Sequence, residues 1–171
     1  MIRAGVAPKQ RNCKLSRVIL FLVALHIWAV GAAAKQPQAG AFDYFVLALS
    51  WSPTYCGTNA GQNDNSQCAR GRRVAFVVHG LGPQYQQGWP QNCATDETCV
   101  SQYEIDAMMP IMPSKKLIIH EWKKHGSCSG VSQSDYFRAT RALFETIKIP
   151  ARYLSPTADV ITTPEQLVTD F

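Results

Sequence analysis

An apolar run near the start of the chain decides where the folded part begins. Residues 18–30 are almost all apolar, only basic charged side chains come before them, and three alanines at 32–34 follow. This order is typical of a secretory signal peptide, here cleaved after Ala34. The alternative is an uncleaved membrane anchor, but the run is shorter than the ~20 apolar residues of a spanning helix and contains His26. We therefore expect residues 1–34 to be a signal peptide, and the protein to be secreted or periplasmic without stable membrane association.

The cysteines of the exported part favour disulfide bonds. Removal of the signal peptide takes Cys13 away and leaves five cysteines, which an oxidising compartment allows to pair. An odd number leaves one without an intramolecular partner, and the sequence alone does not rank the possible pairings. A zinc cluster is disfavoured because no Cys-x-x-Cys pair occurs. The five residues are Cys56, Cys68, Cys93, Cys99 and Cys128.

Two strands are predicted after a short polar linker at 35–41. Residues 42–51 are rich in aromatic and aliphatic side chains, and a second such run covers 74–78. Glycines at 80 and 82 and the proline at 83 break this second run, so that His79 is expected at a strand end, where catalytic groups often occur. Between the strands, residues 56–73 are dominated by Gly, Asn, Gln and Ser and predict a loop.

Helices are predicted in the second half of the chain from caps, periodicity and breakers. They cover 101–109, 117–125, a stretch from the cap at 132–135 to Pro150, and a last segment that begins at Thr163. Separated strands and helices of this kind predict one α+β domain over 42–171.

The net charge of +5 does not by itself indicate a nucleic-acid partner. All of the excess lies in the signal peptide, and from Lys35 onward 12 basic side chains are balanced by 12 acidic ones. Bulk electrostatics therefore gives no support for RNA binding, and such a function has to rest on a site.

Four ionisable side chains share one face of the helix predicted over 117–125. His120, Glu121, Lys124 and His125 lie within an arc of about 140° around the helix axis. Such crowding is unfavourable unless an anion sits over the group. The alternative is a solvated helix face with two incidental histidines. It is the weaker interpretation, because only three histidines remain after signal cleavage.

Metal-independent RNA cleavage explains this set better than a zinc site does. Zinc proteases space their histidines four residues apart, whereas His120 and His125 are five apart and diverge by about 140°. RNA carries its own nucleophile, the 2′-hydroxyl, so an enzyme has to supply a base, an acid and positive charge. Two imidazoles and a lysine fit these needs, with His79 as the third imidazole. No metal and no cofactor are expected.

Two segments of the chain resemble the active-site segments of the ribonuclease T2 family. The stretch Phe-Val-Val-His-Gly-Leu-Gly-Pro at 76–83 is similar to the first, whose usual core reads His-Gly-Leu-Trp-Pro. The stretch Ile-His-Glu-Trp-Lys-Lys-His-Gly-Ser-Cys at 119–128 is similar to the second, His-Glu-Trp-x-Lys-His-Gly-x-Cys. The resemblance covers roughly residues 42–171. It implies a central antiparallel sheet flanked by helices, and cleavage of single-stranded RNA through 2′,3′-cyclic phosphates by a monomeric enzyme that does not act on DNA.

The resemblance also implies a role for each ionisable residue. His125 would be the base that deprotonates the 2′-hydroxyl, and His79 the acid that protonates the leaving oxygen. Glu121 and Lys124 would stabilise the phosphorane, and His120 would contact phosphate. The family pattern implies the disulfide Cys93–Cys128, favours Cys56–Cys68 and leaves Cys99 without a partner.

Two departures from the family pattern qualify this reading. Gly82 stands where the family has a tryptophan that stacks on a base, a contact worth ~1–3 kcal/mol. Tyr85 or Trp89 are the candidates to replace it in substrate binding. Family members also continue with further strands, so we expect a domain incomplete at its C-terminus and an exposed sheet edge. A catalytically impaired RNA-binding relative is therefore the alternative function, and a zinc hydrolase is a third, disfavoured one.

Overall fold

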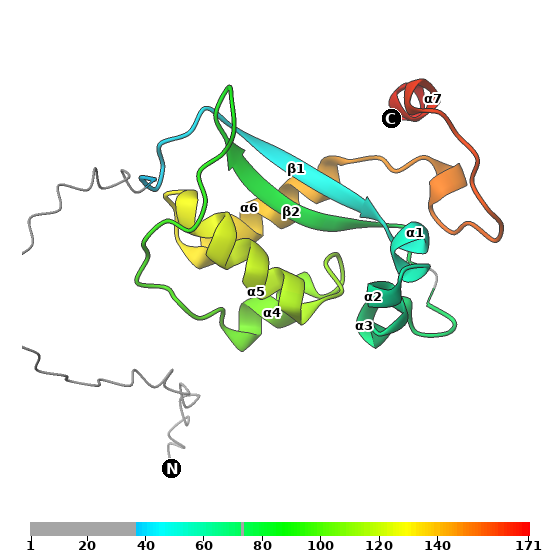
Figure 1. Cartoon of the computed structure of the whole chain (residues 1–171), viewed down its shortest axis with the longest axis horizontal. Coiled ribbons are helices and arrows are strands. Elements are labelled where there is room, and N and C mark those ends of the chain that lie inside the picture. The colour runs from blue at the N-terminus through cyan, green and yellow to red at the C-terminus, as the bar shows by residue number, and fades with distance from the viewer. Residues whose placement is uncertain (1–36, 73) are drawn as a thin grey trace, which may run out of the picture. The chain divides into compact units, whose positions relative to one another are not determined.

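A two-stranded antiparallel sheet lies at the centre of the computed structural model, which describes residues 37–72 and 74–171. Strand β1 spans Tyr44–Trp51 and strand β2 spans Phe76–Gln84. Together with the helices around it (Figure 1), this sheet confirms the predicted α+β class. The predicted signal peptide, including Ala34, lies outside the described residues.

Strand β2 runs six residues beyond its predicted end at 78, so the prediction of a break was wrong. Pro83 lacks an N–H group and is tolerated because each strand of a two-stranded sheet has one unpaired edge. Gly80 pairs with Ala48 and Gly82 with Val46, and this pairing holds both glycines in extended backbone. His79 therefore lies inside the strand and not at its end.

Three helices surround the sheet and close the core. Helix α4 spans Gln102–Met108, α5 spans Lys115–Lys124 and α6 spans Gln133–Thr146. Each begins at a serine whose side chain accepts a backbone N–H bond, as was predicted for the cap of α6. Figure 1 shows α6 behind both strands, and α5 with α4 beside β2. The core consists of Val78, Leu81, Ile105, Met108, Met112, Ile118, Trp122, Tyr136 and Phe137.

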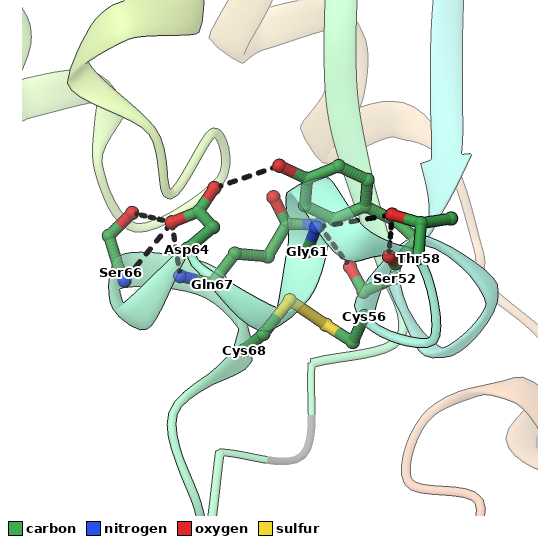
Figure 2. Close-up of a disulfide and its surroundings, with 9 residues drawn as sticks. Ser52, Cys56, Thr58, Gly61, Asp64, Ser66, Gln67 and Cys68 are labelled. Atoms are coloured by element: carbon green, nitrogen blue, oxygen red, sulfur yellow. Dashed lines mark hydrogen bonds between the residues drawn. A yellow bond between two sulfur atoms is a disulfide. The ribbon is translucent and has the colours of Figure 1, made fainter.

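The glycine- and asparagine-rich segment predicted as a loop contains short helices instead. Helices α1 (Ser52–Cys56), α2 (Asn59–Gln62) and α3 (Asn65–Cys68) follow β1 directly. The side chains of Thr58 and Asp64 cap α2 and α3, and a Cys56–Cys68 disulfide closes the segment (Figure 2). Composition alone predicted a loop because caps and a crosslink, and not helix propensity, stabilise these single turns.

A second disulfide ties the chain down directly after α5. It joins Cys93 to Cys128, the last residue of the 3₁₀ turn η1 (Gly126–Cys128). Both pairings match those implied by the family resemblance, and Cys99 is free and exposed. The turn between α5 and the disulfide is tight, because a Cβ on Gly126 would lie 2.5 Å from Cε3 of Trp122.

The C-terminal segment packs against the end of the sheet that is formed by Trp51 and Phe76. It contains the 3₁₀ turn η2 (Ala151–Tyr153) and α7 (Pro164–Asp170), the latter capped by Thr163 as predicted. Tyr153 stacks on Phe171 and donates a hydrogen bond from its hydroxyl to Asp170 at 2.5 Å. In the described part of the chain, no helix combines the length and the apolarity needed to cross a bilayer.

Candidate active site

His79 lies at an irregularity in the sheet that turns its side chain outward. Ala48 pairs with Gly80 and Leu49 pairs with Val78, so His79 is the extra residue of a β-bulge. Bulges are frequent beside active sites because they redirect a side chain. The His79 side chain is 55% exposed, and its Nδ1 lies 3.2 Å from Oγ of Ser50 on the neighbouring strand.

Glu121 is buried behind this histidine. Its side chain is 3% exposed, and Oε1 lies 3.9 Å from Nε2 of His79. The carboxylate fits there only because residue 80 is a glycine, since a Cβ at that position would lie 1.8 Å from Oε2 of Glu121. Burial raises the pKa of Glu121 to about 7, and the positive charge of Lys124 opposes this shift.

His125 follows the last turn of α5 and is not a regular helical residue. It caps the helix with φ −115° and ψ −51°, and its backbone N–H donates to the Glu121 carbonyl at 2.9 Å. The predicted arc of four side chains on one helix face therefore holds only for His120, Glu121 and Lys124. Gly126 and the 3₁₀ turn end the helix one residue earlier than predicted.

The imidazole of His125 is half-buried among positive charges. Its Nδ1 is buried and has no hydrogen-bond partner among the described residues. Burial lowers the pKa of His125 to about 4, and the charges of Lys124, His120 and His79 act in the same direction. His79 and His120 are thus close enough to act on His125 electrostatically.

His79 and His120 line one cavity of about 390 Å³. The rest of its wall comes from β1, from α5 and from the segment closed by the Cys56–Cys68 disulfide. In that segment the carboxylate of Asp64 accepts hydrogen bonds from the backbone N–H groups of Ser66 and Gln67 at 3.1 and 3.2 Å (Figure 2). The side chains that face the cavity include Ser50, Tyr55, Asp64, Gln67, Lys116 and Leu117.

The two aromatic residues predicted to bind substrate lie in the turn after β2 and do not line this cavity. Tyr85 is half-buried, and its backbone N–H donates to the Gly88 carbonyl at 2.9 Å. Trp89 is 52% exposed, so it is not packed into the core.

Sequence reasoning did not find the residues that support the histidines. Ser50 and the cavity residues of α1 and α3 were not predicted as site residues, and the strand register and the disulfide bring them to His79. Within residues 37–72 and 74–171, no group of three or more His, Cys, Asp or Glu side chains is placed to hold a metal ion.

Comparison with known proteins shows similarity to one family. A model described as the Ribonuclease T2 family matches residues 42–161. A ribonuclease of Aeromonas hydrophila is 38% identical over 135 residues, which are 79% of this chain and 60% of the relative. A probable ribonuclease of Haemophilus influenzae is 35% identical over 138 residues, which are 74% of this chain and 49% of the relative. This chain thus spans between about half and three fifths of the length of these two relatives.

One solved structure has a fold similar to that of this chain. The structure of RNase NT in complex with 5′-AMP aligns with a TM-score of 0.50 and 30% identity. The alignment covers 61% of this chain and 56% of RNase NT.

Proposed function

Since the chain belongs to the ribonuclease T2 family, we propose that it is an endoribonuclease that cleaves single-stranded RNA without a metal. The relatives from Aeromonas hydrophila and Haemophilus influenzae are named as a ribonuclease and a probable ribonuclease. The substrate is inferred from the site, and the complex of RNase NT with 5′-AMP supports a nucleotide ligand for this fold. We further propose that the protein acts outside the cytoplasm as a monomer.

The observation that carries this proposal is the meeting of imidazoles from two distant segments. His79 comes from β2 and His120 from α5, yet both line the same cavity. Glu121 adds a buried carboxyl group 3.9 Å from His79. Imidazoles that share a cleft are suited to proton transfer at a phosphodiester.

We assign the base to His125 and the acid to His79. A lowered pKa keeps His125 neutral above about pH 4, so its ring has a free electron pair to accept the 2′-hydroxyl proton. The 2′-oxygen then forms a bond to phosphorus, and the bond to the 5′-oxygen breaks as His79 donates a proton to that oxygen. The product is a 2′,3′-cyclic phosphate. Water opens this ring with the two roles reversed and leaves a 3′-phosphate.

The remaining groups are proposed to act on the charge of the phosphorane. Lys124 supplies a fixed positive charge, and His120 contacts a phosphate oxygen. Glu121 is protonated below about pH 7 and can then donate a hydrogen bond to a phosphorane oxygen. An RNA phosphate placed here would offset the positive charges that lower the pKa of His125, and would make this residue a stronger base.

A cleavage assay on the purified protein tests the proposal. We expect RNA fragments that end in 2′,3′-cyclic phosphate and then in 3′-phosphate, with the same rate in excess chelator. Intact RNA with measurable binding would instead support the impaired RNA-binding relative that Gly82 motivates. Activity that is lost in chelator and restored by zinc would overturn the metal-independent mechanism.

A further inference from the structure

The base of the proposed reaction lacks the partner that would orient it. Nδ1 of His125 is buried without a hydrogen bond among the described residues, whereas Nδ1 of His79 has Ser50 at 3.2 Å. Because Nδ1 is the buried nitrogen, Nε2 is the one left to accept a proton from substrate. A free electron pair on Nε2 requires a hydrogen on Nδ1. A buried N–H group without an acceptor is unfavourable, so we expect a hydrogen-bond acceptor near Nδ1 of His125.

Gln84 places an amide over the same glycine that this nitrogen faces. Alternation along β2 puts residues 82 and 84 on one face of the strand. A Cβ on Gly82 would lie 3.1 Å from Nε2 of Gln84 and 3.9 Å from Nδ1 of His125. The amide of Gln84 and the imidazole of His125 thus border the same small space over Gly82.

The Gln84 amide is free to turn toward the histidine. Its side chain makes no hydrogen bond to any other described residue, and the side chain is half-buried. A glutamine amide offers a carbonyl acceptor on one side and an NH₂ donor on the other, and the two are exchanged by rotation about one bond. The absence of a side chain at position 82 leaves the path between the two groups open.

We propose that Gln84 is a positioning residue whose side-chain carbonyl accepts a hydrogen bond from Nδ1 of His125 across the space left by Gly82. This inference rests on the proposed function, because it concerns the base of that reaction. The glycine leaves this space empty, so that Gln84 can reach His125 and hold it in its reactive tautomer. The charged and titratable groups that act on His125 are Lys124, His120 and His79, and Gln84 is neutral.

Two substitutions of Gln84 test the proposal in the purified protein. Gln84→Leu removes the acceptor, and we expect kcat to fall by about tenfold to a hundredfold, as is usual when the partner of a functional histidine is lost. KM should change little. Gln84→Glu keeps an acceptor and adds a negative charge that stabilises imidazolium. It should recover much of kcat and move the acidic limb of the pH profile to higher pH. Gln87→Leu, on an exposed glutamine of the following turn, is the matched control.

A measurement without substrate separates this proposal from the catalytic one. The ¹⁵N NMR signals of His125 report which ring nitrogen carries the hydrogen. We expect hydrogen on Nδ1 in the wild type, and a mixture with hydrogen on Nε2 in Gln84→Leu. This result would support the role of Gln84 even if the protein did not cleave RNA. Equal tautomer populations and a kcat within twofold of wild type in Gln84→Leu would overturn it. If Gln84→Leu does not fold, Gly82→Ala, which crowds the amide at 3.1 Å, should shift the same signals, and unchanged signals would overturn the proposal.

Discussion

His79 comes from a strand and His125 from the end of a helix, and the two imidazoles have opposite surroundings. His79 projects from a bulge, is 55% exposed and has a serine hydroxyl beside Nδ1. His125 is half-buried among positive charges, and its pKa is lowered to about 4. Two copies of one side chain can serve as acid and base when their environments separate their proton affinities. The fold gives the proposed acid and the proposed base different surroundings by taking one from each region.

The largest effects are expected when either imidazole is removed. His125→Ala and His79→Ala should each lower kcat by about 10²–10⁴-fold, the usual contribution of a general acid or base. His120→Ala should lower kcat by a smaller factor, because that residue is proposed only to contact phosphate. Rates on a defined oligonucleotide check this order. Full activity of His125→Ala would show that His125 is not the base.

Glu121 on the helix should be more sensitive than Gln84 on the strand to a single methyl group added on β2. Gly80→Ala would place a Cβ 1.8 Å from Oε2 of Glu121, and the buried carboxylate would have to move. We expect kcat to fall by about a hundredfold, as for loss of one group that stabilises the transition state. The Tm should fall as well, because overpacking costs about 1–3 kcal/mol. Initial rates measure kcat, and thermal melts beside Gly82→Ala, whose Cβ would meet the flexible amide of Gln84 at 3.1 Å, provide the comparison for the Tm. A Gly80→Ala enzyme with normal kcat would mean that the position of Glu121 is unimportant.

Gly82→Trp separates binding from catalysis. A tryptophan at this position should stack on a base and lower KM by about tenfold or more. The same side chain would displace the amide of Gln84, so we expect kcat to fall while KM improves. Initial rates over a range of RNA concentrations resolve the two parameters. A higher KM would contradict the account of Gly82 as a lost stacking position.

The smallest expected effects concern the dependence of stability on pH, where Glu121 and His125 at the end of α5 act in opposite directions. Glu121 has a raised pKa in the folded protein, so its contribution is complete below about pH 4.5 and is lost as the pH rises through about 7. His125 has a lowered pKa, so its contribution is present above about pH 6.5 and is lost as the pH falls toward about 4.

Glu121→Gln should therefore abolish only the loss of stability that Glu121 causes as the pH rises from about 4.5 to 7. The difference from wild type in the free energy of unfolding should change by on the order of 1–3 kcal/mol between pH 4.5 and 7. Thermal melts across this range measure it. Parallel stability curves for the two proteins would contradict the raised pKa of Glu121.

The sequence was a good guide to the starts of two helices. The predicted caps Ser132 and Thr163 both accept the backbone bonds that their positions predicted. Local chemistry determines such features, because a cap acts within one turn. The family resemblance also implied both disulfides of the structure.

Features that depend on pairing between distant segments were missed. The end of β2 was placed too early because Gly80 and Pro83 disfavour a strand, yet pairing with β1 overrides that preference. The positions of Ser50 beside His79 and of Gly82 beside His125 follow from packing between distant segments, which no local pattern encodes. The burial of Glu121 likewise depends on a glycine 41 positions earlier in the chain.

The bulge at His79 has a consequence for how this protein tolerates insertions and deletions. A regular strand alternates its faces, and the added residue lets both Val78 and Leu81 reach the core although they are three positions apart. Loss of His79 itself would restore regular pairing, because Val78 and Leu81 would then be two positions apart and would still share one face of the strand. A single-codon deletion of His79 should therefore be tolerated by the fold better than the same deletion elsewhere in the strand, which would move the side chains on one side of the gap to the opposite face.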